Sequence, residues 1–176
     1  MSYFIVDVES DGPIIGVHSM VCFGAVLLNE DLTTTFYGKT KPIGKEFIPD
    51  ILKISGFSRE EHESFDDPFD VMSNFAEWLK SNNKNGSPIL ITDNNGYDAS
   101  WINYYFHVFI GRNPFGFSSR RIGDLFCGAN KNLHYQWKRH RDNEKFPHNH
   151  NPVSDAQGNA SALLYFLKTN NMKLPK

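Results

Sequence analysis

Residues 3–10 read Tyr-Phe-Ile-Val-Asp-Val-Glu-Ser, in which Tyr3 to Val8 form a short β-rich run and two acidic residues stand near the end. Side chains two apart on a strand point to the same face, so Asp7 and Glu9 share one face and Val6 and Val8 the other. Two carboxylates on an apolar strand repel each other and resist burial, and a divalent cation relieves both problems. A solvated strand face explains the same pattern, and for Asp-x-Glu alone it is the favoured interpretation.

The segments around this run predict a mixed α/β domain. A three-stranded antiparallel meander is expected from residues 3–8, 20–28 and about 33–38, because the second is continuously apolar and the third is rich in Thr and aromatics. Apolar residues at helical spacing predict core faces on two middle helices, from Phe69 to Leu79 and from Ile102 to Phe109. Further strands are expected at residues 89–91 and near 121–122, residues 130–152 read as irregular, and a last helix carries Ala160, Leu163, Leu164 and Leu167. This order suggests a mixed sheet with helices packed on it.

The chain has 176 residues, a formal net charge of −2 and 40% hydrophobic residues, a composition that excludes disordered, collagen-like and coiled-coil chains. Its length fits one domain over residues 1–176. The longest apolar run, residues 20–28, is too short to span a bilayer, and residues 1–4 lack the basic start of a secretory signal. Cys22 and Cys127 have no metal-ligand spacing, so we expect a cytoplasmic protein with two reduced, buried thiols.

Two further acidic positions stand at the starts of predicted helices. Asp98 ends the polar loop after residues 89–91, and Asp155 follows His150 in a His-x4-Asp pattern before the last helix. Either aspartate could simply cap its helix. However, loops that follow strands are where α/β proteins assemble their sites. A zinc site is a further alternative because of the histidines at 134, 140, 148 and 150, although no cysteine accompanies them at a ligand spacing.

Taken together, these three patterns resemble the sequence motifs of the DEDD-superfamily 3′→5′ exonucleases. The His-x4-Asp form is that of the DEDDh branch, which includes ribonuclease T, oligoribonuclease and the proofreading subunit of bacterial DNA polymerase III. The resemblance spans residues 4 to about 167. It implies a ribonuclease H-like fold, that is, a five-stranded mixed sheet with a three-stranded antiparallel meander, added parallel strands and flanking helices.

The resemblance also implies roles for individual residues. The metal ligands would be Asp7, Glu9, Asp98 and Asp155, and the general base His150. The loop that holds the terminal nucleotide would be Ser10, Asp11 and Gly12, with Asn94 as a further substrate contact. Two positions depart from the family pattern: Asp93 replaces the usual histidine, and Gln157 follows the Asp-Ala pair. Asp93 puts the local charge at the second motif, and with it substrate choice, in doubt.

These residue types suit phosphodiester hydrolysis. Two divalent ions about 4 Å apart can activate the water, stabilise the leaving oxygen and offset the charge of the phosphate. Four carboxylates without thiolates select Mg²⁺ or Mn²⁺ over zinc. Histidine has an ordinary pKa of about 6.5, so it can accept the proton of the water. The expected reaction releases nucleoside 5′-monophosphates from the 3′ end of single-stranded DNA or RNA.

Other interpretations and partners stay open at this point. A catalytically silent nucleic-acid-binding or polymerase-associated module would use the same fold, and a metal-binding protein could use the histidine-rich loop. Residues 131–145 hold five Lys/Arg against two acids, with Tyr135 and Trp137 between them. This segment is either a phosphate-binding and base-stacking surface or a solvated loop with two aromatics in the core. No membrane partner is expected, and several relatives form homodimers.

Overall fold

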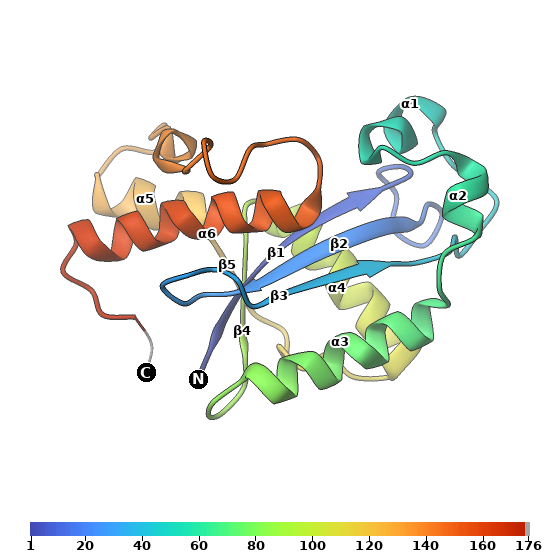
Figure 1. The fold of residues 1–176 in the computed structure, drawn as a ribbon, viewed down its shortest axis with the longest axis horizontal. Helices are drawn as coiled ribbons and strands as arrows, with labels where there is room; N and C mark the ends of the chain where they lie inside the picture. Colours follow the sequence, from blue (N-terminus) through green and yellow to red (C-terminus); the bar gives the residue numbers. More distant parts are fainter. Residues whose placement is uncertain (175–176) are drawn as a thin grey trace.

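Five strands form one mixed sheet in the computed structural model, which describes residues 1–174 (Figure 1). The strands are β1 (Tyr3–Ser10), β2 (Met20–Leu27), β3 (Thr35–Lys39), β4 (Ile89–Thr92) and β5 (Ser119–Arg121). They lie in the order β3-β2-β1-β4-β5, in which β1 and β3 each pair antiparallel with β2, and β4 pairs parallel with both β1 and β5. The predicted meander with added parallel strands is confirmed.

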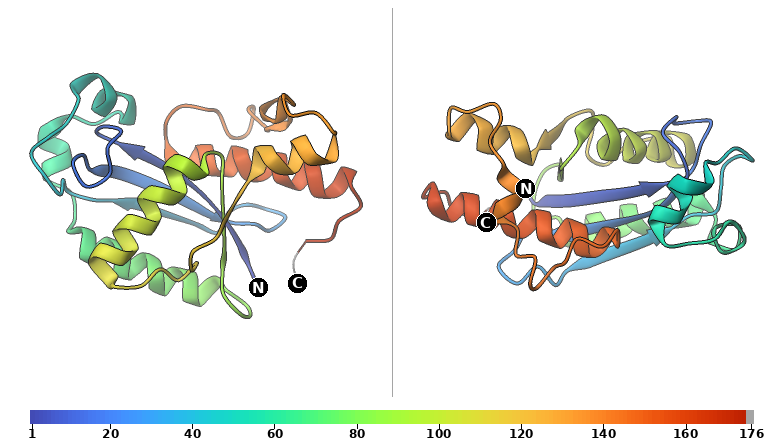
Figure 2. Two further views of the ribbon diagram at one scale, coloured as in Figure 1. Left: turned by 180° about the vertical axis from the view of Figure 1, so that it is seen from behind. Right: turned by 90° about the horizontal axis from the view of Figure 1, so that it is seen from above.

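Helices cover both faces of the sheet (Figure 2). One face packs against α3 (Pro68–Asn82) and against α4 (Ser100–Tyr105) with the helical turns η2 (Asn95–Ala99) and η3 (Phe106–Ile110). The other face packs against α5 (Ile122–Ala129) and α6 (Pro152–Thr169). The short elements α1 (Pro49–Leu52), η1 (Lys53–Ser55), α2 (Arg59–Glu63) and η4 (Trp137–His140) complete the fold. The sequence analysis missed these four and α5, because segments of three to eight residues are too short to establish a helical period.

The alternation predicted for β1 is confirmed. Val6 and Val8 are buried in the core beneath α3 and α4, whereas Ile5 belongs to the core beneath α6. Asp7 and Glu9 share the face of Ile5 and are only partly buried. The two carboxylates therefore lie at the edge of the core beneath α6, not within the core beneath α3 and α4.

Phe69 is an error of the sequence analysis, since 55% of its surface is exposed. The buried residues of α3 are Pro68, Val71, Met72, Phe75 and Leu79. Successive helical residues turn by about 100°, which puts Phe69 roughly a quarter turn from the centre of this stripe.

The prediction of two buried, reduced thiols is correct for Cys22, which is buried, whereas Cys127 is only half-buried; both cysteines are free. Among residues 1–174, no helix is long and apolar enough to cross a membrane.

A glycine in β2 brings α6 close to the sheet. Gly24 pairs with Asp7 across the β1–β2 ladder, and a Cβ at this position would overlap the main chain of Pro152 and Val153. Only a residue without a side chain allows so close an approach. Gly24 therefore sets the distance between the first turn of α6, which carries Asp155, and the carboxylates of β1.

Candidate active site

Three acidic residues from two sequence motifs meet at this junction. Asp7 and Glu9 of β1 and Asp155 of α6 each offer a carboxylate oxygen, and these oxygens lie within 4.8 Å of one another. Asp155 is buried, and the other two are partly exposed. Such a set of oxygen donors suits a hard divalent cation.

Asp155 is not the cap of α6. Asn151 caps the helix, because its side-chain oxygen accepts hydrogen bonds from the main-chain N–H groups of Val153 and Ser154. Pro152 follows at the first helical position, where its missing N–H costs nothing. The carboxylate of Asp155 is therefore available for the site, and the capping alternative is excluded.

Asp98 lies beside these three carboxylates but outside their 4.8 Å set. It is buried in η2, directly after β4. Its Oδ2 accepts a hydrogen bond of 2.9 Å from the main-chain N–H of Asn94. The charge of Asp98 raises the pKa of Asp7, so Asp98 lies close to the acidic end of β1.

Burial and mutual repulsion raise the pKa values of these acids. The pKa of Asp7 lies well above its ordinary value, first because of burial and then because of the charges of Asp98 and Asp155. Burial, reinforced by Asp155, raises the pKa of Glu9 to about 7. Burial is also the main cause that raises the pKa of Asp98 to about 7. A cluster that resists carrying all its negative charges is one that a divalent cation would stabilise, so the donors fit Mg²⁺ or Mn²⁺.

Two histidines approach the acids, where the sequence analysis singled out one. His150 Nδ1 lies 3.3 Å from Glu9 Oε1, and His148 Nδ1 lies 2.6 Å from Asp155 Oδ1. His150 has a φ of 60°, an uncommon conformation for a residue with a side chain. Its main-chain N–H donates to Asp155 Oδ2 at 3.0 Å. Strained backbone of this kind is concentrated at functional sites.

The four histidines of the zinc hypothesis do not gather. His148, His150 and Asp155 offer ligand atoms within 4.8 Å of one another. His140 instead stacks on Tyr165, with ring centroids 4.2 Å apart. Since Asp155 belongs to both this set and the acidic set, the histidine set is an extension of the same site.

A buried arginine, which the sequence analysis placed only in a basic surface segment, belongs to this site. Arg141 donates from Nη2 to Asp155 Oδ1 at 3.0 Å, and the side chains of both residues are almost completely buried. Its guanidinium lies against Gly158, where a Cβ would overlap it. Arg141 and His148 therefore share one oxygen of Asp155, and the glycine one helical turn later makes room for the arginine.

The loop predicted to hold the terminal nucleotide is buried. The Ser10 hydroxyl donates to the carbonyl of Gly12 at 2.6 Å and also contacts the Tyr97 hydroxyl. Gly12 lies against the ring of His18, which leaves no room for a side chain. The side chains predicted to contact substrate at Ser10 and Asp11 instead form the frame of the loop.

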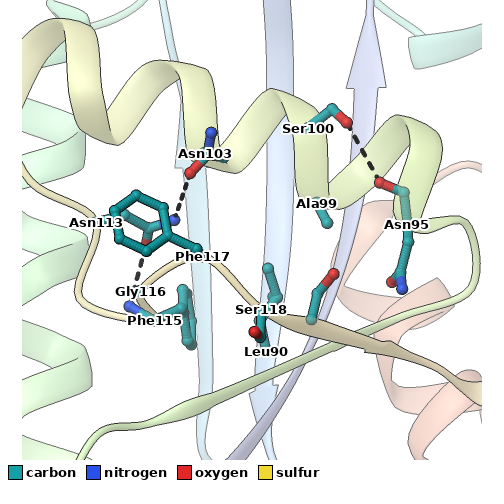
Figure 3. Close-up of a pocket in the computed structure, with 11 residues that line it drawn as sticks. Leu90, Asn95, Ala99, Ser100, Asn103, Asn113, Phe115, Gly116, Phe117 and Ser118 are labelled. Carbon is teal, nitrogen blue, oxygen red and sulfur yellow. Dashed lines mark hydrogen bonds between the residues drawn. The ribbon is translucent and has the colours of Figure 1, made fainter.

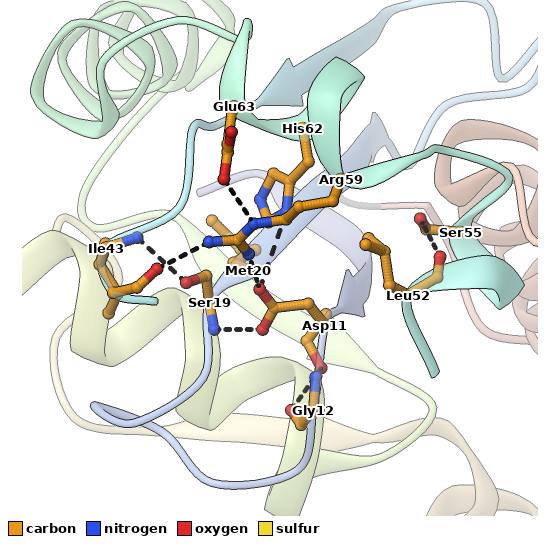
Figure 4. A network of polar contacts seen from close by, with 12 residues as sticks. Asp11, Gly12, Ser19, Met20, Ile43, Leu52, Ser55, Arg59, His62 and Glu63 are labelled. Carbon is orange, nitrogen blue, oxygen red and sulfur yellow. Dashed lines mark hydrogen bonds and ion pairs between the residues drawn. The ribbon is translucent and has the colours of Figure 1, made fainter. Parts of the chain in front are cut away.

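Asp11 joins this loop to α2 through a polar network (Figure 4). Its carboxylate is fully buried, accepts a hydrogen bond from the main-chain N–H of Ser19 at 2.6 Å and pairs with Arg59 Nη1 at 3.0 Å. Arg59 also donates to the carbonyl of Gly44 and to Glu63. His62 is buried nearby, 3.7 Å from Asp11, and burial lowers its pKa to about 4, which keeps it neutral.

Of the two interpretations of segment 131–145, the structure supports the one with aromatic side chains in the core. Trp137 is buried in the core beneath α6, and Tyr135 is half-buried against it. Lys138 is exposed and pairs with Asp93 Oδ2 at 2.6 Å. The residue that departs from the family pattern is thus neutralised by this segment, and Asn94 beside it is exposed.

A neutral pocket of about 170 Å³ lies elsewhere, between α4 and the end of the segment that leads into β5 (Figure 3). Amide and hydroxyl side chains line it, including Asn103 and Asn113, whose side chains share a hydrogen bond of 3.1 Å. None of the four predicted carboxylate ligands lines this pocket.

Comparisons with known proteins agree with this geometry. No family model matches the chain. A curated relative, the 3′-5′ DNA exonuclease Cap18 of Escherichia coli, is 38% identical over 141 residues, which cover 79% of this chain and 73% of the relative. The solved nuclease domain of 3′hExo, a DEDDh family member bound to rAMP, superimposes with a TM-score of 0.79 at 17% identity and covers 99% of this chain and 96% of its own.

A more distant solved structure, E. coli exonuclease I in complex with a dT13 oligonucleotide, has a TM-score of 0.66 at 14% identity, covering 96% of this chain and 41% of that one. The solved structures confirm the predicted ribonuclease H-like fold. The curated relative, at 38% identity, is the comparison that indicates the class of activity.

Proposed function

Because the chain belongs to the DEDDh family of 3′→5′ exonucleases, we propose that it hydrolyses single-stranded DNA from the 3′ end, with two divalent cations and a histidine base. DNA is the choice over RNA because the curated relative is named a DNA exonuclease. The expected products are nucleoside 5′-monophosphates.

The observation that carries this proposal is the meeting of Asp7, Glu9 and Asp155 within 4.8 Å, with Asp98 beside them. These residues come from the three motifs, which are far apart in the sequence. Mg²⁺ or Mn²⁺ ions held by the four carboxylates would offset the charge of the scissile phosphate, acidify the attacking water and stabilise the leaving oxygen.

His150 is assigned as the base that accepts the proton of the attacking water. The support is its contact with Glu9 and its partly exposed ring, which keeps one edge open to solvent. Glu9 would hold the ring in place through Nδ1, which leaves Nε2 as the proton acceptor. The main chain of residues 10–12 would support the terminal nucleotide, and the exposed amide of Asn94 would contact it from the end of β4.

A ladder assay tests the proposal. Oligonucleotides labelled at the 5′ end, as DNA and RNA and as single and double strands, are incubated with Mg²⁺, with Mn²⁺ and with EDTA. We expect stepwise shortening of single-stranded DNA that EDTA abolishes and that a blocked 3′ end resists. Asp155→Asn should be inactive under all conditions.

Three results would contradict specific parts of the proposal. Cleavage of circular single strands at a comparable rate would indicate an endonuclease. Faster degradation of RNA would overturn the choice of DNA. Full activity in EDTA would refute the metal requirement.

A further inference from the structure

A polar groove of about 440 Å³ lies next to the acidic cluster. Its walls are the end of β4, the start of α5 and residues 133–138. This volume is in the range of ligand-binding pockets, which is about 300–1,000 Å³. We propose that this groove binds the second nucleotide from the 3′ end of a single strand, together with the phosphate on its 5′ side; this inference rests on the proposed function.

The groove adjoins the catalytic carboxylates through two residues at the end of β4. Asp93 and Asn94 both line it. The main-chain N–H of Asn94 donates to Asp98, and the charge of Asp93 raises the pKa values of both Asp7 and Asp98. A ligand in the groove is therefore a direct neighbour of a phosphate held at the cluster.

The strand order gives the path of the nucleic acid. The loop of residues 10–12 leads from β1 toward β2 and is tied to α2 through Asp11 and Arg59. β4 lies on the opposite side of β1 from β2. A strand with its terminal nucleotide at that loop and its scissile phosphate at the cluster therefore continues over the end of β4. The groove lies on this course.

Two cations at the groove suit the next phosphate. Lys138 is held by Asp93 Oδ2 at 2.6 Å, and its side chain is 57% exposed. Arg121 donates from Nε to the carbonyl of Asp93 at 2.9 Å and pairs with Asp124 Oδ1 at 3.1 Å, and its side chain is 45% exposed. Asp93 thus anchors both cations beside an acidic cluster that repels nucleic acid, and their exposed faces are available to a phosphate.

The outer wall of the groove suits a base. Leu133 is 89% exposed and presents an apolar side chain at this polar groove. Tyr135 stands beside it in the wall, with the Arg139 guanidinium 4.6 Å from its ring centroid. Apolar and aromatic surfaces of this kind hold unpaired bases without sequence preference. The groove is therefore assigned to single strands.

Substrate length provides the test. A dinucleotide with a free 5′ hydroxyl has no phosphate on the 5′ side of its second nucleotide, whereas a hexanucleotide has one. We expect Lys138→Gln to raise KM for dT6 roughly three- to tenfold, to leave KM for dTpdT unchanged and to lower the salt dependence of kcat/KM for dT6 by about one unit of log–log slope. The double variant Asp93→Asn/Lys138→Gln, which leaves no unpaired charge, should behave in the same way.

Leu133→Ala examines the base contact separately, and it should raise KM for dTpdT and dT6 alike. Lys80→Gln, an exposed lysine on α3, is the charge-matched control and should change neither. If Lys138→Gln changed KM equally for both substrates, or for neither, the groove assignment would be overturned. If Leu133→Ala left KM for both substrates unchanged, the base contact would be overturned. A wild-type protein that degrades neither substrate would instead refute the proposed function.

Discussion

Replacing Glu9 with glutamine is expected to stabilise the metal-free protein at alkaline pH and to abolish nuclease activity. Burial, followed by the charge of Asp155, raises the pKa of Glu9 from 4.5 to about 7. An acid with a raised pKa in the folded state binds its proton more tightly there than in the unfolded chain. The associated stability is fully present below a pH of about 4.5 and is lost as the pH rises through about 7.

The size of the effect follows from this shift. Each unit of pKa corresponds to about 1.4 kcal/mol, so ionised Glu9 costs the folded protein about 3 kcal/mol above pH 7. The Glu9 side chain is only 15% exposed, so solvent screens little of this cost. In a domain of this size, 1 kcal/mol moves Tm by about 2–4 °C. Glu9→Gln should therefore raise Tm by roughly 6–12 °C.

Thermal unfolding followed by circular dichroism in EDTA measures this gain. Wild type and Glu9→Gln are compared at about pH 5 and about pH 8.5, and the difference should be small at the lower pH and several times larger at the higher pH. Mn²⁺ should then raise the Tm of wild type more than that of the variant, because the ion needs the carboxylate that the variant lacks. Glu77→Gln, an exposed glutamate on α3, is the matched control and should change Tm little at either pH.

Two outcomes would refute this reasoning. A Tm gain of the same size at both pH values would mean that the charge of Glu9 is not its cause. A variant that retains near-normal nuclease activity would remove Glu9 from the metal-binding set.

Three further predictions concern the surroundings of Asp155. His150→Ala should lower kcat about 10²- to 10⁴-fold at saturating Mn²⁺, and His148→Ala should lower it much less. If His148→Ala instead had the larger loss of kcat, His148 rather than His150 would be the base. Arg141→Met should lower the free energy of unfolding by about 3–5 kcal/mol in denaturant titrations, because it leaves a buried carboxylate without its arginine; a loss below about 1 kcal/mol would mean that the pair is not buried in solution. Gly24→Ala should cost about 1–3 kcal/mol and also lower kcat, because the new methyl group displaces the first turn of α6; unchanged turnover would show that this turn tolerates displacement.

Much of the fold could be predicted from local patterns. The two-residue period of β1 correctly assigned Asp7 and Glu9 to the face opposite Val6 and Val8. The order of strands and long helices was sufficient for the mixed sheet. The prediction failed where a segment was short, as in α1 and α2, or where a residue stood at the margin of a stripe, as Phe69 does.

The candidate site divides in the same way. Motif spacing selected the four acidic residues and His150, because each motif is contiguous in the chain. It also pointed to the loop of residues 10–12, but it could not foresee that the side chains of Ser10 and Asp11 turn inward, toward Tyr97 and Arg59. These partners lie far along the chain, and no local period encodes such contacts.

By itself, the sequence determined which residues are the candidates for the chemistry and which face of β1 Asp7 and Glu9 occupy, since strand geometry fixes the direction of neighbouring side chains. Only the tertiary structure decided how Asp155 is held. Asn151 takes over the cap of α6, and Arg141 and His148 then share the carboxylate oxygen that remains buried. The physical reason is that a buried carboxylate must find partners wherever packing brings donors, and packing is a property of the whole fold.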